Sequence, residues 1–135
     1  MLASLKFHHV GIAVKDIEKT AVFYANAGYT VSKIFLDPIQ NVKIAWVTKS
    51  EMPTMELIAP VDETSPVSKV LQRNGVSTYH ICYSVESISD AITELRKQKY
   101  ILISKPAGAT AFEGHPVVFL YNKEVGLIEL VELKQ

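Results

Sequence analysis

The chain contains an internal repeat that carries one histidine and one glutamate in each copy. The segment HVGIAVKDIEKTAVFY, which begins at His9, is similar to HICYSVESISDAITEL, which begins at His80, 71 residues further on. A second similarity has an offset of 73 residues and aligns Glu56 with Glu129, so one loop differs in length between the copies. A repeat of this kind indicates two copies of one supersecondary unit that share a core.

The size and composition of the chain indicate one water-soluble globular domain. Its 135 residues can bury a core, and 48% hydrophobic with 21% charged residues is typical of globular proteins. The 14 basic and 14 acidic residues give zero net charge, which argues against nucleic acid or an anionic membrane as a partner. The apolar runs are much shorter than the ~20 residues of a membrane span, and the N-terminus shows no secretory pattern. A single cysteine, Cys82, excludes an intrachain disulfide, and we expect a cytoplasmic protein.

Each half of the chain shows the pattern of a β-α-β-β-β module. In the first half, a strand over 5–14 precedes a helix that Asp16 caps and Gly28 ends. In the second half, Ser87 caps the equivalent helix. Alternating and apolar runs predict further strands at 29–35, 42–48, 55–59, 78–85, 100–104, 116–121 and 127–133.

These elements predict an α+β fold in a single domain that spans residues 1–135. Module 1 covers about 5–60 and module 2 about 77–133, and a linker helix at about 65–75 joins them. Neither module has enough strands to close a core alone. We therefore expect the two modules to be related by an internal pseudo-twofold, with their sheets forming a shared cleft.

The repeated histidines and glutamates predict a metal site. A single histidine in a strand is most often a hydrogen-bonded structural residue, and a single glutamate in an amphipathic strand often faces solvent. His9 and His80 each open the first strand of a half, and Glu56 and Glu129 each lie in an apolar strand, where an unpaired carboxylate is costly. The coincidence of all four favours two histidines and two carboxylates as ligands of one divalent metal ion.

Strand parity separates these four residues from their neighbours. His8 lies on the opposite face from His9, and Glu132 on the opposite face from Glu129, so neither can join the site in a regular strand. Cys82 shares the face of His80 and is interpreted as a small wall residue. His115 follows a glycine in the loop at 106–115, and we interpret it as a surface residue within reach of a substrate.

A set of two nitrogen and two oxygen ligands suits Zn²⁺, Ni²⁺, Co²⁺, Mn²⁺ or Fe²⁺ better than Ca²⁺. A metal ion held only by these four ligands would have a structural role. A six-coordinate ion would have two further positions, which would accept a bidentate oxygen ligand. Such a metal stabilises an enolate, which lowers the cost of removing a proton next to a carbonyl. A ligand glutamate, Glu56 or Glu129, is placed to take that proton.

At these residues the chain resembles the vicinal oxygen chelate (glyoxalase/bleomycin resistance/dioxygenase) superfamily over nearly its whole length. Within it, the chain is most similar to methylmalonyl-CoA epimerases and to the bacterial glyoxalase-like proteins close to them. The resembling segments are HVGIAVKDIEK, MELIAP with SPVSKVLQRNG, YHICYSV and FLYNKEVGLIELVE. The resemblance implies metal ligation by His9, Glu56, His80 and Glu129, and an acid/base role for Glu129.

The resemblance also implies a function. We expect a metal-dependent isomerase or epimerase that moves a proton alpha to a carbonyl, with an acyl-CoA as substrate. A glyoxalase I-type lyase acting on the hemithioacetal of a thiol is the alternative, and a non-catalytic small-molecule-binding protein is a further one. Paired modules of this kind often form homodimers, which we also expect here.

Overall fold

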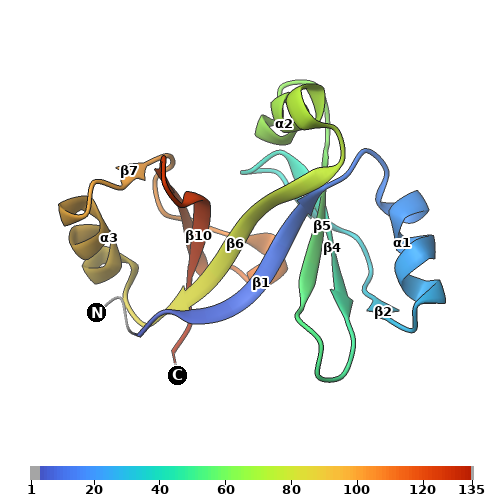
Figure 1. The fold of residues 1–135 in the computed structure, drawn as a ribbon, viewed down its shortest axis with the longest axis horizontal. Coiled ribbons are helices and arrows are strands. Elements are labelled where there is room, and N and C mark those ends of the chain that lie inside the picture. Colours follow the sequence, from blue (N-terminus) through green and yellow to red (C-terminus); the bar gives the residue numbers. More distant parts are fainter. Residues whose placement is uncertain (1–3, 135) are drawn as a thin grey trace. The chain divides into compact units, whose positions relative to one another are not determined.

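Two compact units make up the computed structural model, which describes residues 4–134 (Figure 1). The N-terminal unit is His9–Tyr79, and the C-terminal unit joins the residues up to His8 to those from His80 onward. Each unit contains strands and at least one helix, so the predicted α+β class with two repeated modules is confirmed. Within residues 4–134, no helix is long and apolar enough to span a membrane.

The N-terminal unit is a small mixed sheet with helices. The strands run in the order β2-β4-β5-β1, and β3 also pairs with β4. Helix α1 packs against β4 and β5, and helix α2 packs against β5 (Figure 1). The elements are β1 (Lys6–Ala13), α1 (Ile17–Asn26), β2 (Thr30–Val31), β3 (Phe35–Asp37), β4 (Val42–Thr48), β5 (Met55–Pro60) and α2 (Pro66–Asn74).

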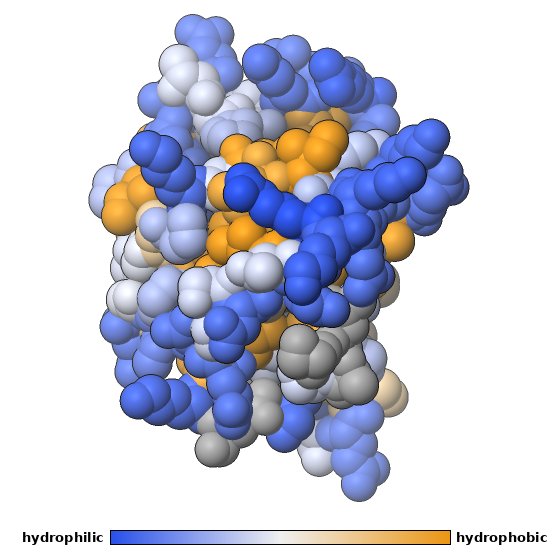
Figure 2. Space-filling view, turned by 90° about the vertical axis from the view of Figure 1, so that its left-hand side faces the viewer, coloured by the Kyte–Doolittle hydropathy of each residue, from blue (hydrophilic) through white to orange (hydrophobic). Residues whose placement is uncertain are grey.

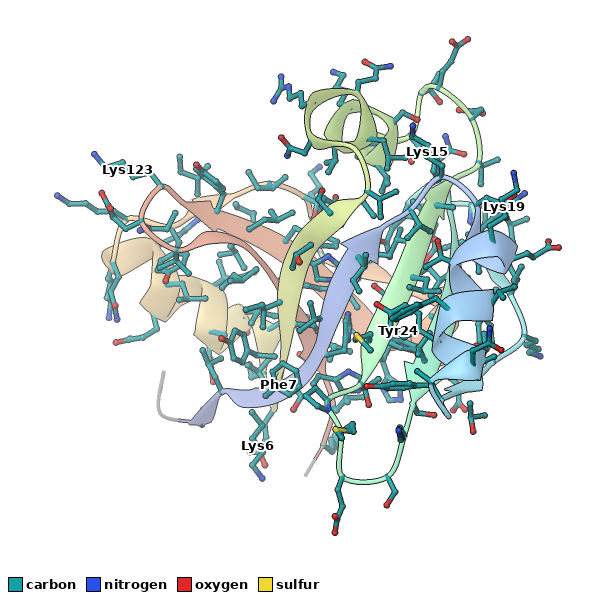
Figure 3. The ribbon with its side chains drawn as sticks, turned by 45° about the vertical axis from the view of Figure 1, so that its right-hand side comes forward. Lys6, Phe7, Lys15, Lys19, Tyr24 and Lys123 are labelled. Carbon is teal, nitrogen blue, oxygen red and sulfur yellow. The ribbon has the colours of Figure 1, made fainter. Side chains whose placement is uncertain are left out.

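Local signals set the ends of the helices in this unit. The Asp16 side chain accepts a hydrogen bond from the Lys19 backbone N–H, 3.2 Å away, as expected of an N-cap. Gly28 follows α1 with a φ of +88°, which a glycine adopts without strain. Tyr24 extends from α1 toward the strands of its unit, whereas Lys19 points outward (Figure 3). The core under α1 consists of Val14, Ile17, Ala45, Val47, Leu57 and Ala59.

The C-terminal unit repeats this plan. Its strands run in the order β6-β10-β9-β7, and β8 also pairs with β9. Helix α3 packs against β7, β9 and β10 (Figure 1). The elements are β6 (Ser77–Val85), α3 (Ile88–Lys97), β7 (Ile101–Leu102), β8 (Ala107–Gly108), a 3-10 turn (Thr110–Phe112), β9 (Pro116–Asn122) and β10 (Gly126–Glu132).

Two caps hold the first turn of α3. Ser87 accepts a hydrogen bond from the Asp90 N–H at 3.2 Å, and Glu132 accepts one from the Ile88 N–H at 2.8 Å. The core under α3 consists of Val85, Ile88, Leu95, Val118, Leu120, Ile128 and Leu130.

The side of the molecule seen in Figure 2 is largely hydrophilic, and apolar residues are visible between the polar side chains.

The prediction of one continuous strand at 29–35, and of another at 100–104, is wrong. In the N-terminal unit, β2 pairs with β4 over two residues and ends, and β3 pairs with β4 further along. In the C-terminal unit, β7 and β8 pair with β9 in the same way. At the break a serine hydroxyl takes the place of the strand backbone: Ser32 Oγ accepts the Trp46 N–H, and Ser104 Oγ accepts the Phe119 N–H. Periodicity alone does not reveal such a break, because serine is compatible with a strand.

Candidate metal centre

The strand register places a histidine and a glutamate on one face of each unit. In the N-terminal unit, β1 and β5 are parallel and Glu56 lies opposite Gly11. In the C-terminal unit, β6 and β10 are parallel and Glu129 lies opposite Cys82. In both cases the glutamate faces the residue two positions after the histidine. Since residues i and i+2 of a strand share a face, each glutamate points to the same side as the histidine of its own half.

The first pair is His9 and Glu56. Nε2 of His9 lies 3.3 Å from Oε1 of Glu56, and the two residues are 0% and 2% exposed. A buried carboxylate must be compensated by a hydrogen bond, an opposite charge or a metal ion. The imidazole of His9 supplies a hydrogen-bonding partner. Histidine Nε2 and glutamate Oε1 are also atoms that commonly bind a divalent cation.

The second pair is His80 and Glu129. Nε2 of His80 lies 3.0 Å from Oε1 of Glu129, with 3% and 2% of the two residues exposed. The geometry of the first pair is therefore repeated in the second unit. Burial, donor type and spacing in each pair fit half of a nitrogen- and oxygen-ligated site for a first-row divalent metal.

The residues set aside by strand parity have other contacts. The His8 ring packs edge-on against Phe112, with ring centroids 5.0 Å apart. Glu132 caps α3 through the Ile88 N–H, as described above. Cys82 is fully buried, which agrees with a small wall residue, and His115 is exposed. Ala109 N–H donates to the His115 carbonyl, so the 106–115 loop is held by backbone hydrogen bonds.

Sequence reasoning missed two aromatic residues next to the histidines. Trp46 packs edge-on against His9, with ring centroids 4.9 Å apart, and Phe119 packs edge-on against His80 at 5.3 Å. The signal was present in the repeat, because both aromatic residues occupy matching places at the same 73-residue offset as the glutamates. It was overlooked because an aromatic residue in a strand is ordinary core material.

Comparison with known proteins defines the class to which this fold and site belong. The Glyoxalase/Bleomycin resistance protein/Dioxygenase superfamily matches residues 8–119, and the chain belongs to this superfamily. Several of its relatives within the superfamily are named as epimerases. It is 38% identical to the human mitochondrial methylmalonyl-CoA epimerase over 132 residues, which cover 96% of this chain and 73% of the relative.

A bacterial relative and a solved structure also carry an epimerase name. The chain is 33% identical to the ethylmalonyl-CoA/methylmalonyl-CoA epimerase of Cereibacter sphaeroides, with 96% and 97% of the two chains covered. A variant of the Streptomyces coelicolor methylmalonyl-CoA epimerase, solved with 2-nitronate-propionyl-CoA, superimposes with a TM-score of 0.81 at 28% identity, covering 95% and 94%. The predicted superfamily and the predicted epimerase-like enzyme class are confirmed by these relatives.

Proposed function

We propose that this protein is a divalent-metal-dependent epimerase of 2-substituted malonyl-CoA thioesters such as methylmalonyl-CoA. The observation that carries the proposal is the duplicated buried pair, His9 with Glu56 and His80 with Glu129, in matching strand register. Burying each pair costs desolvation free energy, and binding of one metal ion by both pairs would offset this cost. We infer that the two pairs together ligate one metal ion.

The substrate class is supported by what the relatives act on and bind. Two relatives that align over nearly the whole of this chain are named for epimerisation of methylmalonyl-CoA. The Streptomyces coelicolor relative was solved with a nitronate at carbon 2 of propionyl-CoA. A nitronate is a planar anion with its charge on two oxygens, so it resembles the enolate that forms when the proton on carbon 2 of a malonyl thioester is removed.

When bound, the metal would stabilise the negative charge that develops on the substrate oxygens. The histidines of this chain would hold the metal and leave the proton transfer to the carboxylates. Epimerisation needs a proton to leave one face of carbon 2 and to arrive at the other. Glu56 and Glu129 come from different halves of the repeat, and we assign them as the pair of groups that take and return this proton.

Deuterium exchange tests the proposal. Metal-loaded protein is incubated with one epimer of methylmalonyl-CoA in deuterated water, and carbon 2 is followed by NMR and by chiral analysis. We expect deuterium to enter at carbon 2 as the two epimers equilibrate. Glu129→Gln should slow this exchange about 100-fold or more, the usual size of an acid–base contribution, and Glu132→Gln should leave it nearly unchanged.

The alternatives give different outcomes in the same assay. Absence of exchange together with turnover of methylglyoxal and glutathione would identify a glyoxalase I-type lyase. Absence of both, with tight binding of an acyl-CoA, would identify a non-catalytic binding protein. The choice among Zn²⁺, Ni²⁺, Co²⁺ and Mn²⁺ follows from elemental analysis of the purified protein and from activity after exchange of each ion into metal-free protein.

We also infer a homodimer and a cytoplasmic location. The edge strand β7 carries Ile101, which is 61% exposed, and Ile103, just beyond it, is 57% exposed. Exposed apolar side chains at a sheet edge favour association with a second copy. Light scattering of the purified protein checks the dimer, and fractionation of expressing cells checks the location.

A further inference from the structure

Each candidate ligand pair has an aromatic partner in a repeated position. In the N-terminal unit, Trp46 of β4 lies directly opposite Glu56 of β5, and its ring packs edge-on against His9 with an interplanar angle of 75°. In the C-terminal unit, Phe119 of β9 lies directly opposite Glu129 of β10. Its ring packs edge-on against His80 at 87°. One ring therefore lies beside both members of each pair.

The backbone hydrogen bonds explain why the ring lies so close to the glutamate. Trp46 donates its N–H to Ser32 Oγ at 2.8 Å and accepts from the Ser32 N–H at 2.9 Å. Both backbone groups of Trp46 thus point away from β5. Trp46 and Glu56 are therefore a non-hydrogen-bonded pair of the antiparallel ladder, the kind in which opposite side chains approach most closely.

The second unit repeats this arrangement. Phe119 donates its N–H to Ser104 Oγ at 3.2 Å, and its carbonyl accepts the Ile103 N–H at 2.9 Å. The serine stands where the edge strand breaks, so without its hydroxyl a half-buried backbone N–H would lose its acceptor. The hydroxyl keeps the aromatic residue in register although the neighbouring strand is interrupted.

We propose that Trp46 and Phe119 are positioning residues that fix the imidazole rings of His9 and His80 for metal ligation, and that Ser32 and Ser104 lock these aromatic residues in place; this rests on the proposed metal site. An edge-to-face contact favours one ring orientation, since the ring edge meets the negative face of the other ring. A ligand ring that is already oriented loses less conformational entropy when the metal binds. Hydrogen-bonding partners that orient a ligand histidine typically change metal affinity by about 10–100-fold, and we expect the aromatic contact to act at the lower end of this range.

The chain offers a matched control for this role. Phe112 packs edge-on against His8 with an interplanar angle of 63°, within the same unit as Phe119 and His80. His8 lies with His9 and Cys82 in a second possible ligand group, but it is not one of the four residues proposed to bind the metal. Phe119→Leu and Phe112→Leu therefore remove the same ring from a histidine, and only the first histidine is expected to bind the metal. If the rings serve only to fill the core, both substitutions should change Co²⁺ affinity to the same extent.

Titration of metal-free protein with Co²⁺ against a competing chelator tests the inference. We expect Phe119→Leu and Trp46→Leu each to weaken Co²⁺ affinity about tenfold and to change the visible absorption of the bound Co²⁺. We expect Trp46→Phe, which keeps a ring on His9, to restore affinity to within about threefold of the wild type, and Phe112→Leu to leave affinity and absorption unchanged. Trp46 is the only tryptophan of the chain, so its fluorescence reports Co²⁺ binding beside His9 directly.

The outcomes separate this inference from the proposed function. If the wild-type protein binds no stoichiometric Co²⁺, the metal site itself is wrong. If the wild-type protein binds Co²⁺ but Phe119→Leu behaves like Phe112→Leu, the positioning role is wrong and the metal site stands. Should Phe119→Leu fail to fold, Ser104→Ala leaves the ring and the ligands in place. It should then weaken Co²⁺ affinity about threefold, and an unchanged affinity and spectrum would overturn the role of the serine lock.

Discussion

Glu129 Oε1 lies 3.0 Å from Nε2 of His80 across the parallel strands β6 and β10, and both residues are at most 3% exposed. Water has little access to these groups at such burial, so the contact between them compensates part of their desolvation. Removing one member takes this contact away from the other, which stays buried. The contact therefore predicts that single substitutions at this pair affect both metal binding and stability.

His80→Ala should abolish metal binding and epimerisation together. The loss of metal affinity should exceed the roughly 10–100-fold that follows when a residue that only contacts a metal ligand is replaced. His8→Ala is the control, because His8 packs on Phe112 rather than on a carboxylate. Isothermal titration with Co²⁺ and the deuterium-exchange assay measure the two effects. Equal Co²⁺ affinity in His80→Ala and wild type would remove His80 from the ligand set.

Glu132→Ala should destabilise the protein by about 1–2 kcal/mol without changing metal affinity. Its carboxylate accepts the Ile88 N–H at the start of α3, a backbone group with no partner inside the helix. Glu132→Gln keeps an acceptor oxygen and should recover most of this stability. Urea unfolding of the metal-free variants measures the change, and a loss of metal binding in Glu132→Ala would contradict its assignment as a cap.

Asp62 should titrate below the usual aspartate value of about 3.9. Hydrogen bonds from the Thr64 hydroxyl, Asn41 and the Thr64 N–H to its carboxylate lower the pKa of Asp62. A lowered pKa in the folded state means that the ionised carboxylate stabilises the folded protein above about pH 3.9. This stabilisation is lost as the pH falls through the lower pKa of the folded state. NMR titration of the Asp62 carboxyl carbon checks the direction, and Thr64→Val should raise the pKa toward the usual value.

A bound metal should raise the unfolding temperature of the wild-type protein. An ion present at 100 times its dissociation constant stabilises the folded state by about 2.7 kcal/mol if it binds only that state. Differential scanning calorimetry with Co²⁺ and with a chelator measures the effect. His80→Ala should show no difference between the two conditions, and an equal shift in that variant would point to binding elsewhere.

The repeat predicted much of the local structure and the choice of candidate ligands. The helix caps Asp16, Ser65 and Ser87 are observed as expected, because a cap is a contact between near neighbours in the chain. Each histidine also lies beside the glutamate of its own half, as the repeat indicated, although the parallel register between the two strands is what brings them together. The four-ligand site itself stays a prediction.

Residue pattern alone predicted the α+β class, the two modules and the candidate ligands His9, Glu56, His80 and Glu129, because periodicity and residue type are local properties. The breaks in the edge strands and the aromatic neighbours of the histidines are visible only in the folded chain. Ser32 and Ser104 act on Trp46 and Phe119 through hydrogen bonds between segments distant in the chain. No periodicity records such contacts, because they depend on the register between strands rather than on the pattern within one.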